Sequence, residues 1–299
     1  MGGLRIGFVG LGAMGGPMAA NLVRKGFVVR GYDLAAEARA RHVARGGEEA
    51  RDPADAAAGA ALLLLVVATA EQARAVLDAA RPALAPGATV VLHATVPPAF
   101  ARGLGEELAA AGNPFLDAPV SGGRLKAEAG ALTIMASGSE AAFAAAGPAL
   151  EAMAAKIYRL GAEPGIASTV KTINQHLAGV HIAAACEAMA LGVRAGADAA
   201  TLYEVIANSA GSSWMFENRV PHILARDFTP LSAVEIFVKD LGIVLDVGRE
   251  LRFPLPLAAA AHQQFLAAAA AGLGREDDSA VVKVYERLAG IEVKGRGEG

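Results

Sequence analysis

Short apolar runs alternate with helix-forming segments along the first half of the chain. Most runs are continuously apolar, as in parallel strands whose two faces are both covered, and flanking Gly and Pro residues favour strands over short buried helices. Strand–helix repetition of this kind predicts a doubly wound α/β sheet. The strands are expected at 4–9, 27–32, 61–67, 89–93, 115–120, 133–136 and 157–160, and the helices between them include 17–25, 71–80 and 100–111.

The pattern changes after Leu160, and no later segment resembles a strand. The Gly- and Pro-containing stretch 161–165 interrupts the chain, and an Ala-rich helix is expected over 166–195, stopped by Gly196. Asp198 is suited to cap a second helix. Further helices are expected from the Ser-x-x-Glu capping-box pattern at 232–235, and over 257–271 and 279–289.

These patterns predict two domains, which is the number expected for a chain of this length. A Rossmann-type doubly wound sheet is expected over 1–163. An all-helical domain over 164–292 follows, linked to the first by the long helix. Residues 293–299, which are rich in Gly, are expected to form a flexible tail.

Composition and charge narrow the class of protein. Hydrophobic residues make up 54% of the 299 residues and charged residues 19%, which excludes intrinsic disorder. The net charge of −3 is spread over interspersed residues, so we expect no nucleic-acid partner and no binding to anionic membranes. The longest uncharged apolar stretch, 56–70, is shorter than the ~20 residues that span a bilayer. A single cysteine, Cys186, fits a reducing compartment, so a soluble cytoplasmic protein is expected.

A glycine-rich turn follows the first predicted strand and precedes a helix. Gly10, Gly12 and Gly15 supply the pattern G-x-G-x-x-G in the context that gives it meaning. The first glycine permits a tight turn, the second lets the backbone approach a pyrophosphate, and the third allows close packing of helix and strand. Amides of this turn, which includes Ala13 and Met14, would attract the phosphates of a dinucleotide. Similar turns also occur without ligands.

Asp33 directly follows the second predicted strand, 18 residues after Gly15. A carboxylate at this spacing accepts hydrogen bonds from the adenosine ribose and repels a 2′-phosphate, which favours NAD over NADP. The alternative is that Asp33 only caps the following helix. Arg39 and Arg41 on that helix leave NADP as the less favoured cofactor.

Lys171, Asn174, Gln175 and Ala178 share one face of the long helix, because they are spaced at i, i+3, i+4 and i+7. A lysine in an apolar setting can lose its charge and act as a general base toward an alcohol. Asn174 could then hydrogen-bond the same hydroxyl group. The alternative is an exposed lysine on a solvated helix face.

Other reactive residue types carry no comparable pattern. His176 and His181 lie on the same helix without a further ligand at metal spacing, so no metal site is expected. Cys186 has no base paired with it and is interpreted as a small buried residue.

Four ordered blocks together resemble the β-hydroxyacid dehydrogenase family, typified by 3-hydroxyisobutyrate dehydrogenase, over nearly the whole chain. The blocks are the cofactor motif at 7–15 with its continuation to 22, Asp-Ala-Pro-Val-Ser-Gly-Gly at 117–123, the segment 165–174, and Phe-Val-Lys-Asp-Leu at 237–241. Gln175 stands where many members have a second Asn.

The resemblance implies roles for individual residues. Lys171 would be the catalytic acid/base and Asn174 its partner, and Lys239 would lie near the nicotinamide and the substrate. The substrate carboxylate would be held by Ser121, Gly122 and Gly123. Thr95 matches a contact to the nicotinamide side of the cofactor, and Thr69 is a further cofactor candidate.

A narrower likeness concerns the helical half. The segments 212–219, 227–230, 253–257 and 276–280 are similar to the L-threonate dehydrogenase branch of the family. The extra hydroxyl groups of such a sugar acid would need polar partners, for which Ser212, Asn218 and Gln175 are candidates. The alternative is that Trp214 and Phe216 only pack the core and the block reflects ancestry.

The resemblance implies NAD-dependent oxidation of a small hydroxyacid, with L-threonate giving 2-dehydro-L-erythronate as the leading reaction. Alternatives are oxidation of 3-hydroxyisobutyrate and reduction of tartronate or succinic semialdehyde. Imine reductases share the architecture, but Lys171 with Asn174 favours oxygen chemistry. A non-catalytic NAD-binding protein would need neither Lys171 nor Lys239. Members of the family often form homodimers or homotetramers, which we also expect here.

Overall fold

The computed structural model describes residues 4–295. The chain divides into two compact units, the first ending at Lys171 and the second beginning at Thr172. The division lies inside the long helix and not at the predicted boundary after residue 163. The physical reason is that the first turns of this helix are tied to the sheet, as described for the site below.

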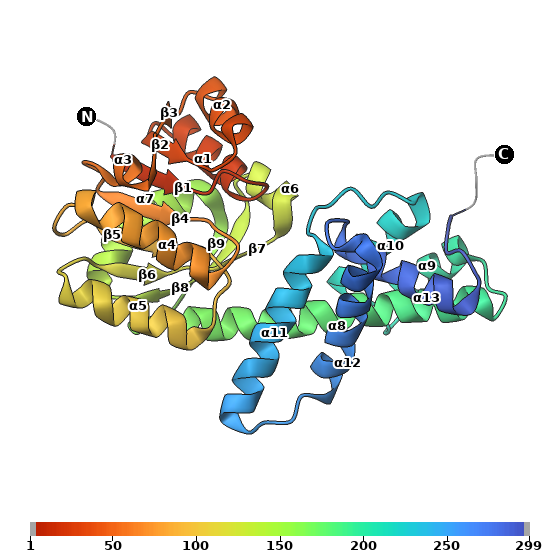
Figure 1. Cartoon of the computed structure of the whole chain (residues 1–299). Helices are drawn as coiled ribbons and strands as arrows, with labels where there is room; N and C mark the ends of the chain where they lie inside the picture. The colour runs from red at the N-terminus through yellow and green to blue at the C-terminus, as the bar shows by residue number, and fades with distance from the viewer. Residues whose placement is uncertain (1–3, 296–299) are drawn as a thin grey trace. The chain divides into compact units, whose positions relative to one another are not determined.

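The first unit contains the sheet and its covering helices (Figure 1). Its strands are β1 (Arg5–Val9), β2 (Val28–Tyr32), β3 (Glu48–Glu49), β4 (Leu62–Leu65), β5 (Thr89–Leu92), β6 (Phe115–Asp117), β7 (Val120–Ser121), β8 (Leu132–Gly138) and β9 (Ala154–Gly161). Its helices are α1 (Gly15–Arg24), α2 (Ala36–Ala44), α3 (Pro53–Ala57), α4 (Ala70–Ala80), α5 (Pro98–Ala110), α6 (Gly123–Glu128) and α7 (Glu140–Met153), with a 3-10 turn η1 (Arg81–Ala83).

The sheet has the strand order β3-β2-β1-β4-β5-β6-β8-β7, and β9 pairs with β8. Strands β1 to β6 are parallel, whereas β8 runs antiparallel to both β6 and β7. The single strand expected at 115–120 is therefore two strands, which separate at Ala118 and Pro119. The order reverses between β1 and β4, and such a switch point is where open α/β sheets bind ligands.

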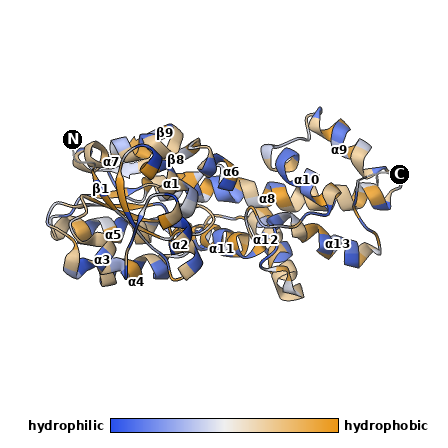
Figure 2. Ribbon diagram, turned by 90° about the horizontal axis from the view of Figure 1, so that it is seen from above, coloured by the Kyte–Doolittle hydropathy of each residue, from blue (hydrophilic) through white to orange (hydrophobic). Residues whose placement is uncertain are grey.

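The continuous apolar runs arise because both faces of the sheet are covered. Leu62 and Leu64 of β4 belong to one hydrophobic core, and Leu63 and Leu65 belong to another on the opposite face. Residues of α1, α6 and α7 complete the first core, and residues of α3, α4 and α5 complete the second. Figure 2 draws β1 in the hydrophobic colour, while the surrounding helices carry both colours. The predicted doubly wound fold is confirmed.

The second unit is helical, as predicted. Helix α8 (Ile166–Arg194) enters it from the first unit, and α9 (Ala199–Ala207) begins at Asp198, whose side chain accepts a hydrogen bond from the Thr201 amide. Helix α10 is not among the predicted helices, and it contains Pro221 in its interior. The remaining elements are α10 (Trp214–Ala225), α11 (Val234–Leu251), α12 (Pro256–Ala268), a π-helical turn η2 (Ala269–Leu273), a 3-10 turn η3 (Asp278–Val281) and α13 (Val282–Ala289).

The expected capping box is wrong. Helix α11 begins at Val234 with Ala233 as its N-cap, so Ser232 is not the cap. The first two helical amides donate instead to the backbone carbonyls of Glu276, at 3.0 Å, and Gly274, at 3.1 Å. Because a neighbouring chain segment supplies these acceptors, the helix start needs no side-chain cap.

The beginning of the predicted tail is packed and not free. Val293 is fully buried, and its amide donates to Glu286 Oε1 at 2.8 Å. The Gly295 amide donates to the carbonyl of Leu224 at 2.9 Å. These contacts hold 293–295 against the helical unit, whereas residues 296–299 of the predicted tail lie outside the described residues.

Helix α8 has an unusual distribution of side chains. By length and composition alone it could cross a membrane, and 39% of its apolar window is buried. Ser168, Lys171 and Gln175 are buried, whereas Ile173 and Leu177 are about half exposed, at 53% and 52%. Polar side chains therefore occupy the buried face of the first turns of this helix, so this part does more than fill a hydrophobic core. Further along, the buried side chains are apolar, among them Ile182 and Met189.

Candidate active site

The glycine-rich turn has the geometry that its sequence predicts. A Cβ atom on Gly10, which has a φ of +99°, would lie 2.1 Å from the carbonyl oxygen of Val66. A Cβ on Gly15 would lie 1.8 Å from the carbonyl oxygen of Gly10, so this glycine allows the helix to approach the strand. At Gly12, by contrast, a Cβ would meet nothing within 4 Å. Gly12 therefore borders open space that a ligand can approach.

Asp33 links the end of β2 to this turn. Its Oδ2 accepts a hydrogen bond from the Leu11 amide at 2.7 Å, and its Oδ1 accepts one from the Ala35 amide at 2.9 Å. The N-cap of α2 is Ala35, so Asp33 is not the helix cap that the alternative interpretation required. The carboxylate is thus fixed beside the turn, where it suits a ribose.

The arginine near Asp33 is already engaged. Arg39 donates to the carbonyl oxygen of Asp33 at 2.6 Å and pairs with Glu49 at 2.8 Å. A guanidinium held by a carboxylate is less available to bind a 2′-phosphate. Together with the Asp33 carboxylate, this arrangement favours NAD.

The two predicted threonines follow β4 and β5. Thr69 is the N-cap of α4 and accepts a hydrogen bond from the Gln72 amide at 3.2 Å, which gives it a structural role whether or not it also contacts cofactor. Thr95 is half-buried just beyond β5. Two residues before it lies His93, a buried histidine that no sequence motif marks. Its Nδ1 is 2.6 Å from the Ala118 carbonyl, and burial lowers its pKa to about 4.

Asp117 anchors the start of α8 to the sheet. This fully buried carboxylate accepts hydrogen bonds from the amides of Gly165, at 3.0 Å, and Ser168, at 2.9 Å, and from the Ser168 hydroxyl at 2.8 Å. Ser137 Oγ accepts from the Ala167 amide at 3.0 Å. Burial raises the pKa of Asp117, while these donors oppose the rise. The sequence contained a signal for this residue, because Asp117 opens one of the family blocks.

The predicted substrate loop follows the same strand. Ser121 lies in β7 opposite Thr133 and is half-buried. Gly122 and Gly123 have φ values of +128° and +68°, a conformation that side chains disfavour. The loop therefore presents a hydroxyl group and backbone amides with little side-chain bulk.

Lys171 is buried, with only 6% of its surface exposed, so the alternative of a solvated lysine is wrong. It lies one helical turn after Ser168, the residue that Asp117 holds. Asn174 follows Lys171 by three positions on the same helix face. The fold thus places an amine and an amide side by side on a helix whose start is anchored.

A chain of polar contacts extends from Asn174 to α11. Asn174 Nδ2 donates to Gln175 Oε1 at 3.0 Å, and Gln175 Nε2 donates to Asp240 Oδ2 at 2.5 Å. The other oxygen of Asp240 pairs with Lys239. The structure therefore brings together three predicted residues and adds Asp240, which was quoted within a family block but given no role.

Ser212 and Asn218 lie near the start of α10 and have local partners. Ser212 donates to Glu217 Oε1 at 2.7 Å, and Asn218 accepts from Arg219. Phe216 is buried and stacks on Tyr203, with ring centroids 5.8 Å apart, whereas Trp214 is 55% exposed. Phe216 thus packs the core, as the alternative interpretation expected, and Trp214 does not.

Within residues 4–295 no group of three or more His, Cys, Asp or Glu side chains could hold a metal ion. Burial and nearby carboxylates raise the pKa of the Cys186 thiol, which leaves it unreactive.

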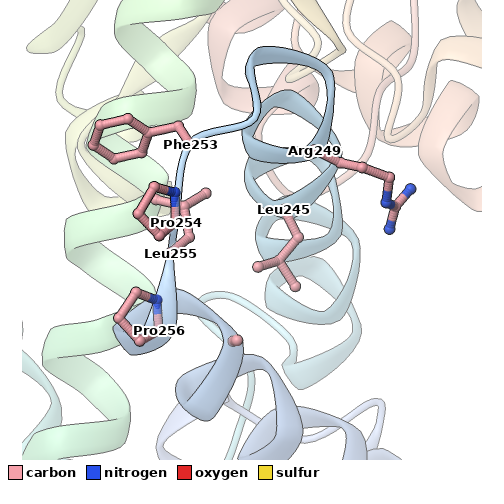
Figure 3. A pocket seen from close by; sticks show the side chains of 7 residues that line it. Leu245, Arg249, Phe253, Pro254, Leu255 and Pro256 are labelled. Atoms are coloured by element: carbon pink, nitrogen blue, oxygen red, sulfur yellow. The ribbon is translucent and has the colours of Figure 1, made fainter.

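A pocket of about 540 Å³ lies at the turn between α11 and α12 (Figure 3). Its lining is mostly apolar and contains none of the predicted site residues. It is formed by Leu245, Arg249, Phe253, Pro254, Leu255, Pro256 and Ala259. The pocket therefore belongs to a different part of the helical unit.

Comparisons with known proteins identify the family of this chain. Residues 5–161 match the NAD binding domain of 6-phosphogluconate dehydrogenase, and 165–285 match the NAD-binding domain of NADP-dependent 3-hydroxyisobutyrate dehydrogenase. The chain is 54% identical to the L-threonate dehydrogenase of Cupriavidus necator, over 98% of this chain and 99% of that one. It is 48% identical to the L-threonate dehydrogenase of Escherichia coli K12, over 97% and 96% of the two chains.

A solved structure supports the same assignment. The crystal structure of 3-hydroxyisobutyrate dehydrogenase from Salmonella typhimurium has a TM-score of 0.88 and 48% identity, over 93% of this chain and 99% of that one. The fold and the dinucleotide turn thus define an NAD-dependent dehydrogenase. The chain belongs to the β-hydroxyacid dehydrogenase family, whose type member is 3-hydroxyisobutyrate dehydrogenase, and it is an NAD-dependent hydroxyacid dehydrogenase.

The residues present fit NAD. Gly12, which borders open space, would hold the pyrophosphate, and Asp33, which is fixed beside the turn, would bind the ribose.

Proposed function

We propose that the protein oxidises L-threonate to 2-dehydro-L-erythronate with NAD. The observation that carries this proposal is the 54% identity, over nearly the full length of both chains, to a protein named L-threonate dehydrogenase. Hydroxyl-rich substrates are selected by polar partners, and Ser212 and Asn218 remain the candidates for these contacts. Gln175 instead contacts Asn174 and Asp240.

Lys171 is the proposed acid/base. Burial favours the neutral form of an amine, and only the neutral form accepts a proton. In oxidation the amine takes the hydroxyl proton of the substrate while the C–H bond releases its hydride and a carbonyl group forms. In the reverse direction the ammonium returns the proton to the nascent alkoxide. Bound NAD supplies the hydride acceptor.

Positioning accounts for the other proposed residues. Asn174 orients the hydroxyl beside Lys171, and Ser121 with the amides of Gly122 and Gly123 holds the carboxylate. Lys239 and Thr95 are proposed to lie on the nicotinamide side. Holding the reacting groups in one arrangement supplies a large part of the rate enhancement of such enzymes.

The second candidate substrate is 3-hydroxyisobutyrate, because a solved structure 48% identical to this chain bears that enzyme's name. The test is reduction of NAD, and separately NADP, by the purified protein with L-threonate, erythronate, tartrate, glycerate or 3-hydroxyisobutyrate. The highest kcat/KM is expected with L-threonate and NAD. A higher value with 3-hydroxyisobutyrate would transfer the assignment to the second candidate.

We also propose that the enzyme is a cytoplasmic homodimer or homotetramer. The half-exposed Ile173 and Leu177 on α8, together with Leu191 at 68% exposure, support burial of this helix against another copy. Sedimentation velocity of the purified protein tests the assembly, and a monomer at micromolar concentration would contradict it.

A further inference from the structure

We propose that Asp240 is a positioning residue that sets the orientation of the Asn174 side-chain amide through Gln175. The inference rests on the proposed function, in which Asn174 lies beside the reacting hydroxyl and Lys171. It assigns Gln175 to the support of Asn174.

The contacts form one continuous relay. Asp240 is 2% exposed and Gln175 is 7% exposed, so water competes little for their hydrogen bonds. Asp240 Oδ2 accepts from Gln175 Nε2 at 2.5 Å, and Gln175 Oε1 accepts from Asn174 Nδ2 at 3.0 Å. The second oxygen of Asp240 pairs with the Lys239 ammonium, which holds the carboxylate in place.

The chemistry of Asp240 gives the relay its direction. An ionised carboxylate can only accept hydrogen bonds, so Gln175 must turn its NH₂ group toward Asp240. The Gln175 oxygen then faces Asn174, whose NH₂ group must donate the hydrogen bond. The oxygen of Asn174 is left on the other arm of the amide. A charge two side chains away thus decides which atom Asn174 offers to its surroundings.

That choice matters for the reaction. An amide oxygen beside Lys171 can accept a hydrogen bond from the O–H of the substrate or from an N–H of the lysine amine, whereas an NH₂ group at the same place can only donate. If the relay were reversed, each amide would rotate and Asn174 would present a donor. The expected consequence is a lower kcat without loss of cofactor binding.

Asp240→Asn tests this, because the asparagine keeps the shape of the side chain. Its oxygen can still accept from Lys239, but its NH₂ group then faces the NH₂ group of Gln175, and the relay reverses. The expected result is a fall in kcat of about tenfold or more, with the Kd for NAD within about threefold of wild type. The assay uses the hydroxyacid that the wild-type enzyme oxidises best.

The double variant Asp240→Asn with Gln175→Glu provides the decisive comparison. The amide introduced at position 240 can donate to one oxygen of the carboxylate introduced at position 175, and Asn174 can donate to the other. The original orientation of Asn174 therefore returns, and the total charge is unchanged. The kcat is expected to recover to within about threefold of wild type. Loss of a merely structural contact, or of the Lys239 partner, would not be repaired by this change.

Two further variants complete the experiment. Asp246→Asn makes the same charge change on an exposed part of α11, where Asp246 pairs with Arg249, and should leave kcat unchanged. Gln175→Met breaks both links while leaving Asp240 paired with Lys239, and should lower kcat about as much as Asp240→Asn. Wild-type kcat in Asp240→Asn or Gln175→Met, or no recovery in a folded double variant, would overturn the relay. Inactivity of the wild-type enzyme toward the whole panel would instead refute the proposed function.

Discussion

The carboxylate of Asp117 accepts a hydrogen bond of 2.8 Å from the hydroxyl of Ser168, one helical turn before Lys171. The same carboxylate accepts hydrogen bonds from the backbone amides of Gly165 and Ser168. The strand that precedes the proposed substrate loop thereby also holds the start of the helix that carries the proposed acid/base. Substrate loop and acid/base are thus tied to one buried side chain.

Asp117→Ala should destabilise the protein and reduce kcat, because two buried helix amides lose their acceptor. We expect a loss of about 2–4 kcal/mol in the free energy of unfolding, and a smaller loss for Asp117→Asn, which keeps one acceptor oxygen. Urea unfolding and steady-state kinetics measure both effects. Asp52→Ala is the control, since Asp52 is an exposed residue that caps helix α3. The Asp52→Ala substitution should lower the free energy of unfolding by about 1 kcal/mol and leave kcat unchanged.

Lys171→Ala should abolish turnover without removing cofactor. General acid–base groups typically contribute ~10²- to 10⁴-fold, so kcat should fall by at least about 100-fold. Binding of NAD, measured by fluorescence titration, should remain within about threefold of wild type. Lys156→Ala, at an exposed position of β9, should retain wild-type kinetics. Near-native turnover in Lys171→Ala would rule out its role.

Gly12→Ala and Gly15→Ala should affect different properties. The first should weaken NAD binding, and the second should lower the stability of the fold. The Cβ at Gly12 meets open space, so the variant should fold normally but bind NAD at least about tenfold more weakly. The Cβ at Gly15 would collide with the Gly10 carbonyl, so this variant should lose about 1–3 kcal/mol of stability. Isothermal titration calorimetry and thermal unfolding distinguish the two. Equal loss of stability in both variants would contradict the open space at Gly12.

His93 should make stability depend on pH. Burial lowers its pKa from 6.5 to about 4 in the folded state, so the unfolded chain binds a proton at intermediate pH while the folded protein does not. The contribution of His93 to the free energy of unfolding is therefore fully present above pH 6.5 and is lost as the pH falls toward 4. Between pH 7.5 and 5 this loss amounts to about 2 kcal/mol.

Urea unfolding of wild type and His93→Asn at these two pH values measures this contribution. The difference in free energy of unfolding between wild type and His93→Asn should shrink by about 2 kcal/mol when the pH is lowered from 7.5 to 5. His181→Gln serves as the matched histidine control. An identical pH dependence in wild type and His93→Asn would show that His93 is not responsible.

Local patterns predicted much of this molecule correctly. The glycines at 10, 12 and 15 act through backbone geometry within a few residues, so their spacing was sufficient to locate the turn. The four Leu residues at 62–65 form one continuous apolar run because both faces of the strand are buried. Such a run is visible in the sequence. Asp198 caps its helix through a contact three residues away.

Predictions failed where a distant segment supplied the partner. Ser232 matched a capping box, but the backbone of 274–277 occupies that helix start. The tail was expected to be free from residue 293, but Glu286 and Leu224 bind it. The expected strand 115–120 is two strands that separate at Ala118 and Pro119, and β8 pairs antiparallel with both.

The sequence alone determined the fold class, the dinucleotide turn and the helix face that carries Lys171 and Asn174, because each depends on periodicity or spacing within one segment. Only the tertiary structure decided that Lys171 is buried, that Asp117 anchors its helix, and that Asp240 reaches Gln175 across 65 residues of chain. Burial and hydrogen bonding between distant residues depend on which elements pack together. Periodicity within one element carries no information about that packing.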